Sequence, residues 1–224
     1  MKVLITGASG MVGKGVLLEC LDSPVVEQVL SVGRSKIDIQ HSKLKQFDIP
    51  DFMDLSQVEG KLGGYDACFF CVGVSSIGME EDTYRRLTYD LTLEFASAFL
   101  ADNPKSSFIY VSGKGTDRSE KGKVMWARVK GATENQIDRM GFEDAYFFRP
   151  NYIQPLRGIR SKTGWINVVY SLIGFSYNLF LKNLPAAATD TSRLGRAMIH
   201  AIQFRPKLKI YNTREINALA ARQD

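Results

Sequence analysis

Hydrophobic and polar positions follow two alternating patterns along most of the chain. Short continuous apolar runs, typical of strands buried on both faces, are separated by longer segments in which apolar residues recur every three or four positions. The expected strands are Val3–Thr6, Val29–Gly33, Lys45–Ile49, Asp66–Gly73, Ser107–Ser112 and Ala145–Arg149. The expected helices are Met11–Leu21, Glu81–Asp102 and Lys123–Met140. This alternation predicts an α/β fold in which helices cover both faces of a doubly wound parallel sheet.

The regular alternation ends at Pro150. The rest of the chain predicts a loop, a half-buried amphipathic helix over Trp165–Leu184, a second helix near Thr191–Phe204 and a short tail. No low-complexity linker or internal repeat divides the sequence. We therefore expect residues 1–224 to form one domain, with its core in residues 1–155 and a small C-terminal helical elaboration on the substrate side in residues 156–224.

Composition and charge narrow the class of protein. The 224 residues are 45% hydrophobic and 24% charged, as in an ordinary soluble globular protein. The net charge of +5 comes from scattered basic residues, so we do not expect nucleic-acid binding. Polar residues interrupt Trp165–Leu184 too often for a membrane span. The first strand follows Met1-Lys2 directly and leaves no room for a secretory signal, so we expect a cytoplasmic protein.

The cysteines give no framework of disulfides or metal ligands. Cys68 and Cys71 have CxxC spacing, but they lie in an expected strand, where a separation of three residues places the two sulfurs on opposite faces. Cys20 has no sequence partner, and the two histidines are remote from the cysteines. We interpret all three cysteines as packing residues and expect no metal site.

A glycine-rich turn leaves the first strand and opens the first helix. It reads Gly7-Ala8-Ser9-Gly10-Met11-Val12-Gly13, in the strand–turn–helix context that the Rossmann dinucleotide-binding motif requires. Gly7 permits a tight turn, Gly10 lets the backbone approach a pyrophosphate, and Gly13 lets the helix pack closely on the sheet. The alternative is a glycine turn without a ligand. The residues expected to contact the dinucleotide here are Gly7, Ser9, Gly10, Met11, Val12 and Gly13.

The end of the second strand indicates which dinucleotide is bound. NAD-binding sites of this fold usually place a carboxylate there, to accept a hydrogen bond from the ribose 2′-hydroxyl. This chain instead has Arg34, Ser35 and Lys36, and a guanidinium donates well to a 2′-phosphate. The cofactor prediction is therefore NADP(H), against the alternative that Arg34 is a solvated loop residue. Asp48 follows the third strand, where it could meet the adenine amino group or simply be solvated.

Several short motifs together resemble the atypical short-chain dehydrogenase/reductases, and within them the branch of the Tat-interacting-protein-like oxidoreductases. The resemblance covers about the first 155 residues, and weakly the rest. The matching segments are Thr6–Gly13, Val32–Arg34, Cys71–Gly73, Tyr110–Asp117, Val129–Glu134 and Phe148–Pro150.

The resemblance implies a set of catalytic residues. In that family a serine after the fifth strand polarises the substrate carbonyl, and a tyrosine four residues before a lysine exchanges the proton. The four-residue spacing puts both side chains on one helix face. Ser112 and Lys130 match the serine and the lysine, but Trp126 occupies the tyrosine position. Because an indole does not titrate near neutral pH, Trp126 cannot replace the tyrosine as a proton carrier. Tyr84, Tyr152 or a bound water could carry the proton instead.

The resemblance also implies further cofactor contacts. The segment Cys71-Val72-Gly73 should pass beneath the cofactor, and Lys130 should bind the nicotinamide ribose. The backbone after Arg149 should meet the nicotinamide carboxamide through Pro150, Tyr152 and Ile153. Ser35 should add a donor at the 2′-phosphate.

Two functions follow from these residues, and the sequence leaves both open. The first is an NADP(H)-dependent oxidoreductase that transfers hydride to or from a small carbonyl or hydroxyl compound. The second is an NADP(H)-binding sensor or regulatory protein that acts through protein partners, its catalytic tyrosine lost. Ser112 and Lys130 favour the enzyme, and Trp126 favours the binding protein. The oligomeric state is also open, with a homodimer among the alternatives.

Overall fold

The computed structural model describes residues 1–55, 57–58, 60–159 and 186–222. The helix expected over Trp165–Leu184 lies wholly outside these ranges, so that prediction stays untested.

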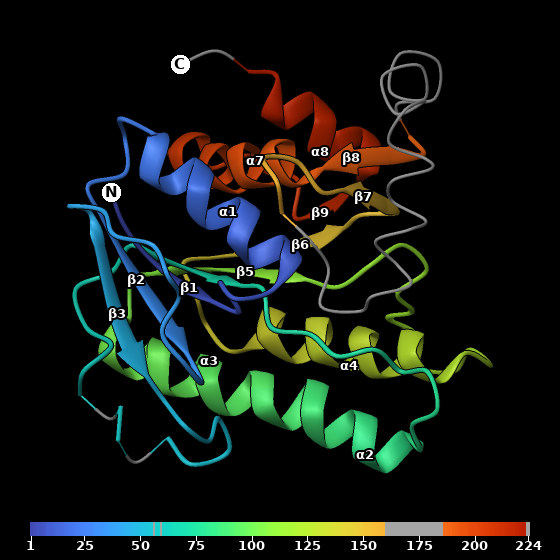
Figure 1. The fold of residues 1–224 in the computed structure, drawn as a ribbon. Helices are drawn as coiled ribbons and strands as arrows, with labels where there is room; N and C mark the ends of the chain where they lie inside the picture. Colours follow the sequence, from blue (N-terminus) through green and yellow to red (C-terminus); the bar gives the residue numbers. More distant parts are fainter. Residues whose placement is uncertain (56, 59, 160–185, 223–224) are drawn as a thin grey trace.

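The described residues form a central sheet of seven parallel strands in the order β3-β2-β1-β4-β5-β6-β9 (Figure 1). The strands are β1 Lys2–Thr6, β2 Gln28–Gly33, β3 Leu44–Asp48, β4 Ala67–Phe70, β5 Ser107–Val111, β6 Asp144–Arg149 and β9 Ile210–Asn212. The order reverses between β1 and β4, and this change of direction opens a crevice at the carboxyl ends of the strands. The predicted doubly wound α/β fold is confirmed.

Helices cover both faces of this sheet (Figure 1). One face carries α1 Met11–Asp22, α7 Thr191–Phe204 and α8 Thr213–Ala220. The other carries α4 Met125–Arg139 and a continuous helical run made of α2 Glu81–Arg85, the π-helical turn η1 Arg86–Asp90 and α3 Leu91–Asp102. Two buried apolar clusters fill the two layers, because successive residues of a strand point to opposite faces.

The C-terminal tail differs from the prediction. Residues expected as a short tail form β9, which pairs with β6, and then α8. Asn212 and Glu215 form a reciprocal capping box that starts α8. Three residues are too few to show a strand period, so β9 was not predictable from periodicity. A separate parallel pair, β7 Tyr152–Gln154 with β8 Ala188–Asp190, was also not predicted.

Strand β4 ends earlier than expected. It stops at Phe70, so Cys71-Val72-Gly73 lies in a loop at the carboxyl edge of the sheet instead of inside the strand. The thiols of Cys20, Cys68 and Cys71 are free, and burial raises the pKa of the Cys71 thiol to about 12. Within the part of the chain that the structure describes, no helix is both long and apolar enough to cross a bilayer.

Candidate functional site

Each of the three glycines of the first turn is required for a different structural reason. Gly7 has φ +70°, and a Cβ there would lie 2.7 Å from the carbonyl oxygen of Cys71. A Cβ on Gly13 would lie 2.3 Å from the carbonyl oxygen of Gly7, so α1 packs too closely for any larger residue. Gly10 is the N-cap of α1, and its Cβ would lie 3.2 Å from the same oxygen. The first amides of α1 therefore point without side-chain cover toward the crevice.

A cavity of about 330 Å³ lies on one side of Gly10, over the ends of β1 and β2. Arg34 lines it and is exposed, and no carboxylate of the described residues forms an ion pair with it. The predicted Asp48 is exposed but does not line this cavity. The lining residues are Gly7, Ser9, Gly10, Gly33, Arg34, Ser35, Asp51, Phe52, Met53, Cys71, Val72, Gly73, Val74, Leu87 and Leu91.

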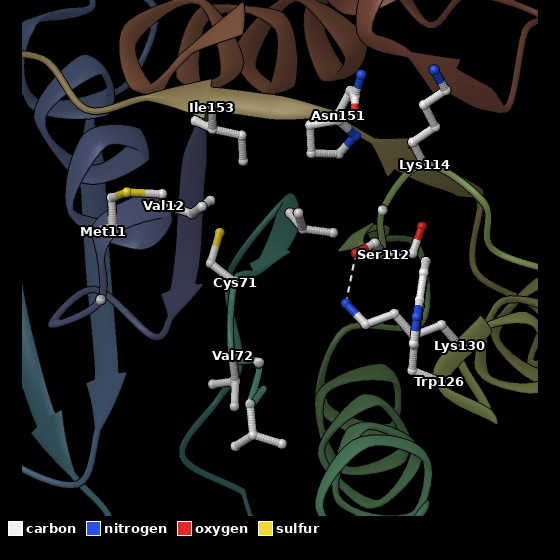
Figure 2. Close-up of a pocket in the computed structure, with 16 residues that line it drawn as sticks. Met11, Val12, Cys71, Val72, Ser112, Lys114, Trp126, Lys130, Asn151 and Ile153 are labelled. Atoms are coloured by element: carbon white, nitrogen blue, oxygen red, sulfur yellow. Dashed lines mark hydrogen bonds between the residues drawn. The ribbon is translucent and has the colours of Figure 1, made fainter. Parts of the chain in front are cut away.

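A second cavity of about 470 Å³ lies on the other side of Gly10, over the ends of β4 and β5 (Figure 2). Its lining residues are Gly10, Met11, Val12, Cys71, Val72, Gly73, Val74, Val111, Ser112, Gly113, Lys114, Trp126, Lys130, Pro150, Asn151 and Ile153. Gly10 and the segment 71–74 line both cavities, so the two meet in one cleft that crosses the carboxyl edge of the sheet. A dinucleotide is an elongated ligand of the kind such a cleft suits.

Lys130 enters the second cavity from α4. Its Nζ donates a hydrogen bond of 2.6 Å to the backbone carbonyl oxygen of Ser112, drawn as the dashed line in Figure 2. Burial lowers the pKa of Lys130 to about 8, against the opposing charge of Glu134 one helical turn later. An ammonium with this pKa exchanges protons near neutral pH.

The hydroxyl of Ser112 takes part in a buried hydrogen-bond network that we did not predict from the sequence. Ser112 Oγ donates to Glu134 Oε1 at 2.6 Å, and Glu134 is fully buried. Arg149 donates to both carboxylate oxygens, from Nε at 2.9 Å and from Nη2 at 2.5 Å. A serine has one proton to donate. As placed here, Ser112 gives that proton to Glu134 and has none left for a substrate carbonyl.

Trp126 forms a wall of the second cavity beneath the loop that follows β5. Cβ atoms built on Gly113 and Gly115 would lie 4.0 Å and 3.5 Å from its indole ring. Gly113 has φ +154° and Gly115 φ +94°, which L side chains rarely adopt. The indole therefore lies opposite the Gly113-Lys114-Gly115 segment in addition to filling the tyrosine position.

The structure brings together most of the predicted site residues, but not all. Among the lining residues of the two cavities are Ser112, Trp126, Lys130 and every predicted cofactor contact except Gly13, Asp48 and Tyr152. Tyr152 donates its hydroxyl to Gln154 Oε1 at 2.6 Å, and Tyr84 is 2% exposed. Neither tyrosine lines the second cavity. Whether the lining residues bind a cofactor stays a prediction.

Sequence reasoning missed several lining residues. Asp51, Phe52 and Met53 follow β3 and take the position expected for Asp48. The sequence feature that could have indicated them is Ile-Pro-Asp after β3, because this sequence ends the strand and turns the chain back over the cleft. Lys114 was inside a quoted motif, and its signal is its place between two glycines.

The fold and the cleft are of the Rossmann type, and comparisons with known proteins agree. No protein-family model matches the chain. Protein HTATIP2 of Rattus norvegicus is 28% identical over 153 residues, which are 67% of this chain and 62% of the rat protein. The mitochondrial protein FMP52 of Candida albicans is 24% identical over 203 residues, 87% of this chain and 86% of that protein.

Solved structures share the fold. The enzyme WbmF of Bordetella bronchiseptica, in complex with NAD⁺, superposes with a TM-score of 0.68 at 16% identity, covering 98% of this chain and 76% of that one. An ADP-L-glycero-D-manno-heptose-6-epimerase of Helicobacter pylori superposes with a TM-score of 0.67 at 15% identity, covering 98% of this chain and 81% of the epimerase chain. These likenesses support the resemblance of the chain to the atypical short-chain dehydrogenase/reductases and, among them, to the Tat-interacting-protein-like branch.

The relatives correct the expected location. Three fungal relatives, at 24%, 24% and 27% identity, are named mitochondrial proteins, so the prediction of a cytoplasmic protein is wrong. The residues before the first strand bear only on a secretory signal, and the fold itself carries no information about compartment.

Proposed function

We propose that this protein is an NADP(H)-dependent oxidoreductase that transfers hydride between the nicotinamide and a small carbonyl or hydroxyl compound. The observation that carries the proposal is the single cleft across the sheet edge, with Arg34 at one end, Gly10 at the crossing and Lys130 at the other end. We also propose that residues 1–224 act as one domain.

The lining residues fit a phosphorylated dinucleotide. The uncapped amides at the start of α1 suit the pyrophosphate, and the missing Cβ of Gly10 keeps that approach open. Arg34 and Ser35 would hold the 2′-phosphate, because no described carboxylate competes for the Arg34 guanidinium through an ion pair. Solved neighbours bound to NAD⁺ or NAD support a nicotinamide dinucleotide, and Arg34 is our reason to choose the 2′-phosphorylated form.

Lys130 is our candidate for the proton donor. When bound, the reduced nicotinamide supplies the hydride that goes to the carbonyl carbon. The carbonyl oxygen then needs a proton, and none of the described residues that line the second cavity is a tyrosine, histidine or carboxylate. Cys71 is a poor donor because burial raises its thiol pKa to about 12. The Lys130 ammonium gives up a proton and regains it from solvent, with its carbonyl contact to Ser112 holding the side chain in place.

The cleft is tested with Gly10→Val. Two added methyl groups would stand where the pyrophosphate must approach, so NADPH binding measured by calorimetry should be lost while circular dichroism stays native. Gly63→Val is the matched control, because Gly63 is exposed, lies outside both cavities and has room for a Cβ. Normal NADPH affinity in Gly10→Val would overturn the cofactor assignment. NADPH oxidation by the unmodified protein on a panel of small aldehydes and ketones then tests the reaction.

A second candidate is an NADP(H)-binding regulatory protein without turnover. Two observations favour it, namely the indole of Trp126 at the tyrosine position and the hydroxyl of Ser112 donated to Glu134. NADPH binding without oxidation on the whole carbonyl panel would favour this candidate over the enzyme.

A further inference from the structure

The second cavity has an asymmetric distribution of charge. Its described lining includes two lysines, Lys114 and Lys130, and no carboxylate. Lys130 is held by the backbone carbonyl of Ser112. Lys114 is exposed, and no described residue pairs with its ammonium. Lys130 thus uses one of its three donors on the protein, whereas the Lys114 ammonium has no partner among the described residues.

The two lysines lie at different ends of the cavity. Lys130 rises from α4, whereas Lys114 extends away from it toward the rim where Asn151 also lies (Figure 2). The Lys114 backbone is fixed by a 3.0 Å hydrogen bond from its amide to the carbonyl oxygen of Pro150. The flanking glycines, Gly113 and Gly115, face the Trp126 indole, which a Cβ added at either position would contact. The base of the Lys114 side chain is thus held rigidly at the mouth of the cavity.

Apolar side chains make up much of the lining between these ends, namely Met11, Val12, Val72, Val74, Val111, Trp126, Pro150 and Ile153. Those not assigned to the cofactor above, Val74, Val111 and Trp126, remain for the body of a substrate. A neutral polar ligand would gain little here, and a dianion would face a single unpaired cation. A compound with an apolar body and one monovalent anion satisfies both ends.

We infer that the substrate is a carbonyl compound with an apolar body and a carboxylate at the end remote from the carbonyl, and that Lys114 binds this carboxylate. The inference rests on the proposed function for the position of the carbonyl, near Lys130.

Matched acid and amide pairs test the inference. The ligands are 4-acetylbenzoate and 4-acetylphenylacetate, each compared with its own carboxamide, which has the same shape without the charge. Aryl ketones form imines with lysines less readily than aldehydes do. Binding is measured by calorimetry on the protein with and without NADP⁺, for the unmodified chain, Lys114→Met and the control Lys123→Met, an exposed lysine that does not line the cavity.

We expect each acid to bind about five- to tenfold more tightly than its amide, the range for one charge-assisted contact at a partly solvated site. Lys114→Met should remove this difference and leave NADP⁺ affinity unchanged, and Lys123→Met should keep it. Equal affinity for acid and amide, persistence of the difference in Lys114→Met, or no binding of any of the four ligands at millimolar concentration would overturn the inference. Loss of NADP⁺ binding with a retained acid preference would instead overturn only the proposed function.

Discussion

Replacing Lys130 by Met removes a buried charge while keeping the length of the side chain. Burial lowers the pKa of Lys130 from 10.5 to about 8. The folded state therefore disfavours the charged lysine. This cost is present in full below about pH 8, and it is relieved as the pH rises toward the unfolded value. The free energy of unfolding of the unmodified protein should accordingly increase with pH, relative to Lys130→Met, across that window.

The size of the effect follows from the two pKa values. Linkage gives about 2 kcal/mol between about pH 7 and pH 9.5, and solvent screening of the partly exposed side chain reduces this to about 1–2 kcal/mol. Urea denaturation at a series of pH values measures it, with Lys121→Met as a control on an exposed lysine of the preceding loop. If the unfolding free energies of the unmodified protein and Lys130→Met run parallel from pH 7 to 9.5, Lys130 does not carry a depressed pKa. The proton-donor role would then lose its chemical basis.

Two further substitutions test the surroundings of Lys130. Trp126→Tyr would place a phenol on the same helix face as Lys130, and general acid–base catalysis is worth about 10²–10⁴ in rate. Steady-state NADPH oxidation should therefore rise measurably; an unchanged or lower rate would mean that the phenol is not positioned to transfer a proton. Glu134→Gln would leave the Arg149 guanidinium, 15% exposed, without its counter-charge, so thermal or urea unfolding should show a loss of about 3–5 kcal/mol. A loss below about 1 kcal/mol would contradict the view that this pair is structurally essential.

The fold was predictable because its signals are local. The first six strands, apart from the mixed Leu-Lys-Gln-Phe-Asp sequence of β3, carry apolar runs bounded by turn residues. The glycine turn after β1 is encoded by its own residues. The strand β9 was not predictable, because three residues gain their strand geometry only from pairing with β6, about 60 positions earlier. The early end of β4 at Phe70 likewise depends on how the sheet edge is closed.

The cofactor side of the site was easier to predict than the catalytic side. The proposed roles of Arg34 and Gly10 follow from their position directly after a strand. The role of Ser112 depends instead on its contacts with Glu134 and Arg149. These three residues are far apart in sequence and meet only in the folded protein. One signal was present, because Glu134 follows Lys130 by four residues and so shares its buried helix face.

The most direct measurement is the ratio of the dissociation constants for NADH and NADPH. Charge-assisted hydrogen bonds from Arg34 to the 2′-phosphate should supply about 1.5–3 kcal/mol, a preference for NADPH of roughly ten- to a hundredfold. In Arg34→Asp the preference for NADPH should narrow or reverse. Lys36→Asp makes the same change of charge outside the cavity lining, and it should keep the preference. Equal calorimetric affinities of the unmodified protein for NADPH and NADH, or no binding of either, would contradict the assignment.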